Sequence, residues 1–145
     1  MKEKYLITVR GTQVVDGESE TEELTTTADY TVREGKKLIK YREFGATEEN
    51  SDFIVSNLIK LEVGKVTLTK RMEGRTGQMI FECGVRHQCM YANEVGNLTI
   101  GIFTETIIDE IGPDGGTLEI EYTIDFNGGF ESENHIFITL TKTEE

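Results

Sequence analysis

Apolar residues recur at every second position through the middle of the chain, between residues 65 and 106. The alternation is carried by Val66, Leu68, Met79, Phe81, Leu98, Ile100 and Ile102. A period of two is typical of a strand with one buried face. Glycines such as Gly74 and Gly84 mark the places where the chain reverses. The pattern therefore predicts a meander of four antiparallel strands.

The same alternation continues on both sides of this meander. It predicts strands over residues 5–15, 24–33, 37–44 and 53–61 before it, and over 118–126 and 136–140 after it. Turn-forming sequences separate them at 16–18, 34–36, 62–65 and 112–116, and residues 45–51 form a polar loop.

Two segments leave alternatives open. Ile54, Leu58 and Leu61 also fit a helical spacing, so a helix is the alternative to the strand predicted over 53–61. After Thr106 the phase of the alternation is lost, which indicates either a longer strand or a β-bulge.

About eight to ten strands with closely spaced turns predict an all-β fold. Long strands with short links favour a single antiparallel up-and-down β-barrel, because closure removes exposed strand edges. The whole chain, residues 1–145, is long enough to form one such domain with its own core.

The net charge of −12 argues against general nucleic-acid binding, because phosphate is repelled by such an acidic protein. The charge is uneven: the segment from Lys60 to His87 carries +3 and leaves −15 for the remainder. That segment is either a mixed solvated surface or a local anion site. No apolar run is long enough for a signal peptide or a membrane span, so we expect a cytoplasmic protein without a membrane partner.

Residues 79–104 (MIFECGVRHQCMYANEVGNLTIGIFT) and 115–126 (GGTLEIEYTIDF), with LIKYREF upstream, resemble the YwiB-like proteins of Gram-positive bacteria. The resemblance implies a calycin-like (lipocalin-type) β-barrel in a cytoplasmic bacterial protein. It implies no assigned activity and supplies no catalytic residues. The chain has no tryptophan and so lacks the Gly-x-Trp signature of secreted lipocalins, whose ligands cannot be inferred for it.

Cys83 and Cys89 flank a predicted hairpin. If Arg86 lies at its tip, the two cysteines face each other and a disulfide is geometrically feasible. In a reducing cytoplasm we expect two thiols instead. With His87 they offer three soft zinc ligands, but a fourth ligand is missing, so no metal is expected.

No catalytic constellation emerges from the remaining residues. His87 has no nucleophile at a recognisable spacing, and His135 is interpreted as a solvated residue of a loop before the last strand. Glu119 and Glu121 look like a solubilising acidic face and not a glycosidase pair. No phosphate-binding or dinucleotide fingerprint is present, so we expect no cofactor. A protein without enzymatic activity is favoured, and an enzyme is the weaker alternative, which a deep pocket holding a histidine or a carboxylate with a shifted pKa would support.

Two functional hypotheses follow. In the first, a non-enzymatic barrel binds a small, partly apolar molecule, with aromatic side chains around it and Arg71 at an anionic end. The candidate ligand-binding residues are Tyr41, Arg71, Phe81, His87, Tyr91 and Tyr122. In the second, the barrel is filled by side chains and acts as a structural or protein-interaction module, as a monomer or a homodimer.

The orientation of Arg71 decides whether its guanidinium can contact a ligand inside the barrel. Simple alternation places it outside, with Thr67 and Thr69. A bulge near Gly74 would turn it inward, where Glu43, Glu82 or a bound anion would have to pair with it. The resemblance to the YwiB-like proteins favours the inward orientation.

Overall fold

The computed structural model describes residues 4–45, 53–72, 74–92, 97–126, 129 and 131–143. These residues form ten strands: β1 (Tyr5–Val15), β2 (Glu18–Arg33), β3 (Lys36–Gly45), β4 (Phe53–Glu62), β5 (Lys65–Met72), β6 (Arg75–Glu82), β7 (Arg86–Ala92), β8 (Asn97–Gly112), β9 (Gly115–Asp125) and β10 (Glu131–Lys142). None of the described residues is helical, so the segment from Phe53 is a strand and the helical alternative is wrong.

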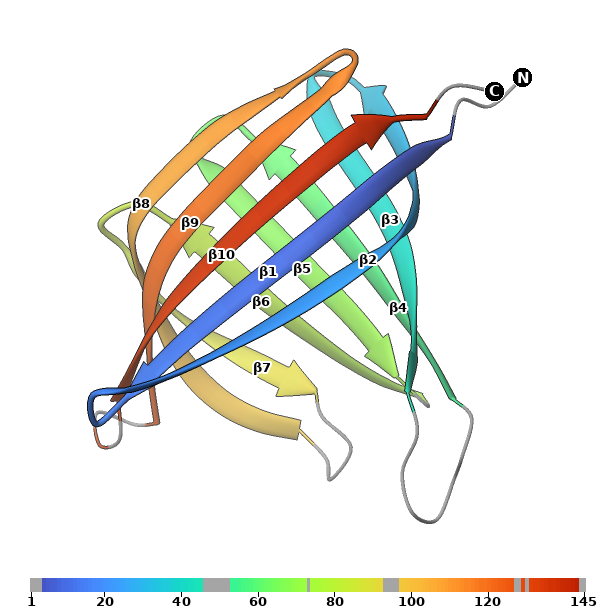
Figure 1. Cartoon of the computed structure of the whole chain (residues 1–145). Helices are drawn as coiled ribbons and strands as arrows, with labels where there is room; N and C mark the ends of the chain where they lie inside the picture. Colours follow the sequence, from blue (N-terminus) through green and yellow to red (C-terminus); the bar gives the residue numbers. More distant parts are fainter. Residues whose placement is uncertain are drawn as a thin grey trace.

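Each strand pairs antiparallel with its neighbours in the sequence, and β1 also pairs with β10, which closes the barrel (Figure 1). The predicted all-β class and up-and-down barrel are therefore confirmed. The four-stranded meander of the sequence pattern is β5 to β8. Of the polar loop predicted over residues 45–51, positions 46–51 lie outside the described residues. No helix among the described residues is long and apolar enough to cross a membrane.

A β-bulge in β8 explains why the alternation loses its phase after Thr106. The pairing of β8 with β9 shifts register between Thr104 and Thr106, so Glu105 is the additional residue. Before it, even-numbered residues such as Ile100 and Ile102 are buried inside the barrel. After it, the inward residues are odd-numbered, and Ile111 is buried. The strand extension and the bulge that the sequence left as alternatives are both present.

One end of the barrel is filled by side chains. Its fully buried residues include Ile7, Ile39, Ile59, Leu61, Phe81, Leu118, Ile120 and Leu140. Figure 1 shows the start of β1, the end of β10 and the β8–β9 turn at this end. The backbone N–H of Thr143 donates to the carbonyl of Lys4 at 2.9 Å, which joins the residue before β1 to the residue after β10. We call this the closed end.

At the opposite, open end the wall is split between β2 and β3. These strands pair only from Ala28 to Arg33 of β2. Between Glu18 and Thr27, β2 pairs with β1 alone in the part of the chain that the structure describes. Likewise, within the described ranges, residues 42–45 of β3 pair with β4 alone. The barrel therefore widens toward the open end.

Two strands begin earlier than the apolar alternation predicts, both at the open end. β2 starts at Glu18 and β10 at Glu131. The prediction that His135 lies in a solvated loop is therefore wrong. It lies within β10, where its Nε2 is 2.6 Å from Oε2 of Glu119 on β9. The starts of both strands are hidden in the sequence because polar residues occupy their inward positions as well as their outward ones.

Candidate ligand cavity

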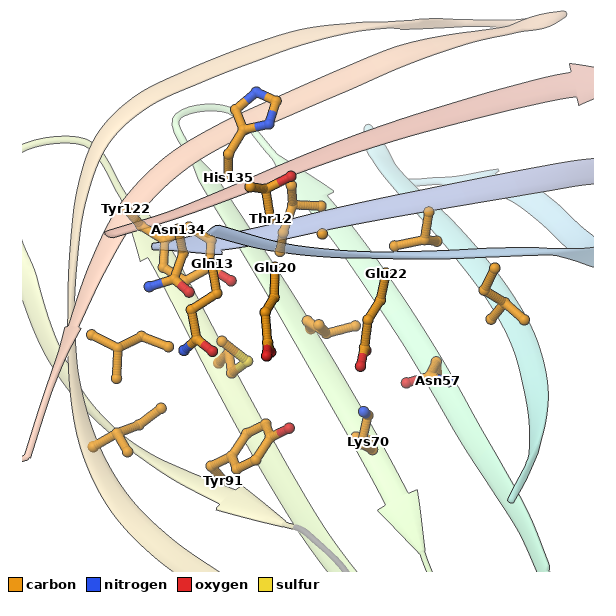
Figure 2. Close-up of a pocket in the computed structure, with 18 of the residues that line it drawn as sticks. Thr12, Gln13, Glu20, Glu22, Asn57, Lys70, Tyr91, Tyr122, Asn134 and His135 are labelled. Carbon is orange, nitrogen blue, oxygen red and sulfur yellow. The ribbon is translucent and has the colours of Figure 1, made fainter. Parts of the chain in front are cut away.

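The open half of the barrel encloses a cavity of about 770 Å³ (Figure 2). Most of the side chains that reach it follow the strand alternation: odd positions of β1, β3 and β4, and even positions of β2, β5 and β9. Thr12 of β1 and Glu23 of β2 border the cavity from the opposite parity. A volume of this size is typical of small-molecule sites, which span roughly 300–1,000 Å³. We call it the interior cavity.

The floor of the interior cavity is apolar. It is formed by Val9, Leu24, Leu68, Met79, Ile100 and Ile124. Tyr122 also lines it and stacks edge-to-face on Phe81, with ring centroids 4.8 Å apart. Phe81 is fully buried beneath and belongs to the core. Burial raises the pKa of Tyr122, so its phenol is neutral. The floor can thus accept an apolar group.

One wall of the cavity carries a connected polar cluster from β3, β4 and β5. The side-chain amide of Asn57 donates to Oε2 of Glu43 at 2.7 Å. Nζ of Lys70 lies 4.0 Å from the same oxygen and 5.9 Å from the ring centroid of Tyr91. Tyr41 is buried beside this cluster, and its pKa is raised by burial and by the charge of Glu43. The charged side chains of Glu43 and Lys70 therefore lie next to the apolar floor of the cavity.

Asn57 holds a buried acceptor that no described residue satisfies. Its side chain is only 3% exposed, yet Oδ1 has no hydrogen-bond partner in the described part of the chain. An amide flip does not resolve this, because the oxygen would then face the carboxylate of Glu43, which can only accept. A donor is required at this place in the wall, since an unsatisfied buried acceptor costs about 1–3 kcal/mol.

The rim of the cavity is polar. Nε2 of Gln13 donates to Oγ of Ser132 at 3.3 Å, and Nδ2 of Asn134 donates to the same oxygen at 3.0 Å. Glu20 and Glu22 project from β2 into the cavity; Figure 2 shows both carboxylates on the side that faces Tyr91 and Lys70. The opening thus presents carboxylate and amide groups to an incoming molecule.

The structure brings together only some of the candidate residues. Tyr41, Tyr91 and Tyr122 all line the interior cavity. Phe81 lies under it in the core, in contact with Tyr122. His87 does not line it: the residue lies near the β6–β7 turn at the closed end, where Nε2 is 2.9 Å from Oε1 of Glu82.

Arg71 is on the outside of the barrel. Val66 and Met72 of β5 are buried, whereas Arg71, one residue before Met72, is exposed. It borders an outer groove together with Lys40 and Arg42. The inward orientation expected from the resemblance is therefore wrong, and the simple alternation of β5 holds up to Met72. Arg71 cannot meet the end of a ligand inside the barrel.

The two cysteines are not cross-strand partners. The hairpin turns at Gly84 and not at Arg86, because the N–H of Val85 bonds to the carbonyl of Glu82 at 3.1 Å. Both thiols are free; Cys83 is exposed and Cys89 is buried. Burial raises the pKa of Cys89, which keeps its thiol neutral. No group of three metal-ligating side chains occurs among the described residues.

The polar cluster was missed by the sequence analysis, although a signal existed. Asn57 interrupts the apolar series that runs through Val55 and Ile59, and Lys70 interrupts the series from Leu68 to Met72. A polar residue at an inward position must be paired or face a cavity. That rule would have selected Asn57 and Lys70 as candidates.

The comparisons with known proteins agree with the architecture. No curated protein matches the chain. A crystal structure of the ywiB protein from Bacillus subtilis superimposes with a TM-score of 0.82 at 19% sequence identity, over 99% of this chain and 94% of that one. At this identity the likeness concerns the fold. The family model described as a domain of unknown function, DUF1934, matches residues 7–138. The chain therefore belongs to the DUF1934 family, whose barrel it shares with YwiB.

Proposed function

We propose that the protein is a non-enzymatic, calycin-like barrel of one domain that binds a small, partly apolar molecule in its interior cavity. The observation that carries this proposal is the 770 Å³ cavity itself, apolar at its floor and polar at its wall and rim. Ligand sites combine these features, because apolar contacts supply affinity while a few polar groups fix orientation.

Binding without catalysis is favoured by where the reactive side chains lie. The two histidines are each engaged by a carboxylate, His87 by Glu82 and His135 by Glu119. Cys89 is buried in the core. A bacterial origin is supported by the likeness to a Bacillus subtilis protein, and a cytoplasmic setting by the two free thiols, which a reducing compartment preserves.

Gly11 on β1 offers a direct test, because it lines the cavity and a Cβ built there would meet no atom within 4 Å. Gly11→Leu should fill part of the cavity without disturbing the wall, whereas Gly11→Ala is the matched control. We expect the uncharged dye Nile red to gain fluorescence with the wild type and Gly11→Ala, and much less with Gly11→Leu. Native mass spectrometry of protein purified from cells should show a bound small molecule in the wild type.

Equal dye fluorescence for the wild type and Gly11→Leu would contradict binding in the interior cavity. A stable wild-type protein that neither binds the dye nor carries a co-purified molecule would contradict the function altogether. Circular dichroism of each variant checks that the barrel is intact.

A second function is favoured by the split between β2 and β3. The edge of β2 from Glu18 to Thr27, which pairs with no strand on the β3 side among the described residues, can pair with a strand of another chain. A homodimer through this edge would place Glu20, Glu22 and Glu23 near their own copies, so a basic partner strand fits better. An alternating Lys–Val peptide should shift the β2 amide resonances in nuclear magnetic resonance spectra, and a Glu–Val peptide should not. Unchanged β2 resonances with both peptides would exclude this interaction.

A further inference from the structure

We infer that the interior cavity selects molecules with a cationic, hydrogen-bond-donating head group, such as a primary ammonium or a guanidinium, attached to an apolar tail. The inference rests on the proposed binding function and names the chemical class of its ligand. The ligand expected here is cationic, whereas an inward-facing Arg71 would have implied an anionic ligand.

The first argument is the charge on the cavity wall. Glu20 and Glu22 reach the cavity from β2 and Glu43 reaches it from β3. Lys70 is the cationic side chain among the described residues that line it. A fourth carboxylate that borders the cavity, Glu23 of β2, is paired with Arg10. One lysine facing the other three carboxylates leaves an excess of negative charge at the polar end of the cavity. Opposite charge raises the local concentration of a cation and repels an anion.

The second argument is the acceptor of Asn57, which is independent of the acidic residues. Its Oδ1 is buried, lacks a partner among the described residues, and Figure 2 draws it on the side that faces Lys70 and the cavity. The side chain cannot swing away, because its amide nitrogen is held by Glu43 at 2.7 Å. An ammonium or guanidinium donates several hydrogen bonds and accepts none, so it satisfies this oxygen where a carboxylate would not.

The third argument concerns Lys70, the group that would instead favour an anion. Its Nζ stands 4.0 Å from Glu43, at the outer limit of an ion pair, and also lies over the ring of Tyr91. Lys70 is thus already drawn toward a carboxylate and an aromatic face. It offsets part of the negative charge of Glu43 and leaves Glu20 and Glu22 to a ligand.

The apolar floor completes the site. Leu68 is the inward-facing residue next to Lys70 on β5, two positions before it in the sequence. Leu68 pairs with Met79 on β6. A molecule with its charged group at Asn57 can therefore lay an alkyl or aromatic tail on the floor. The combination of a cationic head and an apolar tail matches the two surfaces that the cavity presents.

The test compares three probes with the same tail: decylammonium, decanol and decanoate, each below its micelle-forming concentration, displacing Nile red. We expect decylammonium to bind about tenfold or more tightly than decanol, since a hydrogen bond to a charged group is worth about 1.5–3 kcal/mol, and decanoate to bind weakest. The preference for decylammonium should decrease as salt is added.

One residue of the cavity and one of the outer surface localise the effect. Glu22 of β2 projects into the cavity, whereas Glu121 of β9 is exposed on the outside of the barrel and does not line the cavity. Glu22→Gln and Glu43→Gln should each weaken the binding of decylammonium several-fold and leave that of decanol unchanged. Glu121→Gln should change neither.

The outcomes separate the two proposals. If Nile red does not bind in the cavity, the proposed function fails and the head-group preference has no site. If Nile red binds but decanol or decanoate displaces it as well as decylammonium does, or no alkyl probe displaces it, the cationic preference is overturned while the binding function stands. Equal effects of Glu22→Gln and Glu121→Gln would likewise overturn it, because the attraction would then come from the whole acidic surface.

Discussion

The guanidinium of Arg86 on β7 reaches across β8 to the carboxylate of Asp125 on β9. Nη2 donates to Oδ1 at 2.6 Å and Nε donates to Oδ2 at 2.9 Å. The guanidinium passes over Gly101, which pairs with Gln88 on one side and with Asp125 on the other. A Cβ at position 101 would overlap the guanidinium. Glycine is therefore what allows one ion pair to span three strands.

Gly101→Ala should lower the stability of the barrel by displacing Arg86 from Asp125. The reason is steric, because the added methyl group occupies the path of the guanidinium. Arg86→Ala should lower stability too, since Asp125 is largely buried and would lose both hydrogen bonds. Denaturant unfolding of both single variants and the double variant measures the coupling. A loss from Gly101→Ala that is just as large in the Arg86→Ala background would show that the two residues act independently.

Three of the five tyrosines should resist ionisation while the barrel is folded. Burial raises the pKa values of Tyr30, Tyr41 and Tyr122. Unfolded tyrosines ionise near pH 10. Unfolding above that pH therefore releases protons from these tyrosines, so their contribution to the stability is constant below about pH 10 and is lost as the pH rises further. A titration followed by phenolate absorbance should show these tyrosines ionising together with unfolding, and Tyr122→Phe should weaken the pH dependence. Five tyrosines ionising near pH 10 with the circular-dichroism spectrum unchanged would contradict this expectation.

The sequence predicted the barrel well where the barrel is filled. At the closed end the inward residues are apolar, as Ile59 and Leu118 are, so period two is visible. At the open end the inward residues are polar: they are Glu20 and Glu22 on β2 and Asn134 on β10. Both faces of those strand segments are polar, so the alternation disappears where the polar rim of the cavity begins.

The cavity itself could be predicted only in part. The recurrence of aromatic residues on separate strands predicts Tyr41, Tyr91 and Tyr122 as ligand-binding residues, and all three line the cavity. Whether an inward residue meets a neighbour or empty space depends on how ten strands close, which no local pattern contains. The sequence marks Asn57 as unusual, because it is a polar residue in an apolar series. It does not show that the side-chain oxygen of Asn57 lacks a donor among the described residues, since this depends on the position of Glu43, which binds the amide nitrogen.

Arg71→Ala should change the free energy of unfolding by no more than about 0.5 kcal/mol, as expected for an exposed residue. The buried control is Ile59→Ala on the neighbouring strand β4, which should cost about 2–5 kcal/mol because it leaves a cavity in the core. Chemical denaturation of the two variants under identical conditions makes the comparison. A loss for Arg71→Ala similar to that for Ile59→Ala would mean that the guanidinium is buried and paired.

Gly116 of the β8–β9 hairpin should be difficult to replace by any residue with a side chain. It has a φ of 144°, a conformation that residues with a side chain rarely adopt. A Cβ there would overlap the carbonyl oxygen of Glu110 on β8, and a backbone atom within a ladder cannot move aside as a flexible side chain can. Gly116→Ala should therefore cost about 2 kcal/mol or more, from backbone strain and overpacking together.

Gly11→Ala is the matched control for Gly116→Ala, because it also places one methyl group in a strand of the same barrel. A methyl group on Gly11 would have no atom within 4 Å, and the residue has no positive φ. The substitution should therefore be neutral or stabilise the folded barrel by about 0.4–1 kcal/mol, because alanine leaves the unfolded chain fewer conformations than glycine does. Thermal and denaturant unfolding should place Gly116→Ala well below the wild type and Gly11→Ala level with it or above it. Equal losses would mean that the barrel penalises any added methyl group, and that the close approach of β9 to β8 at Gly116 has no special cost.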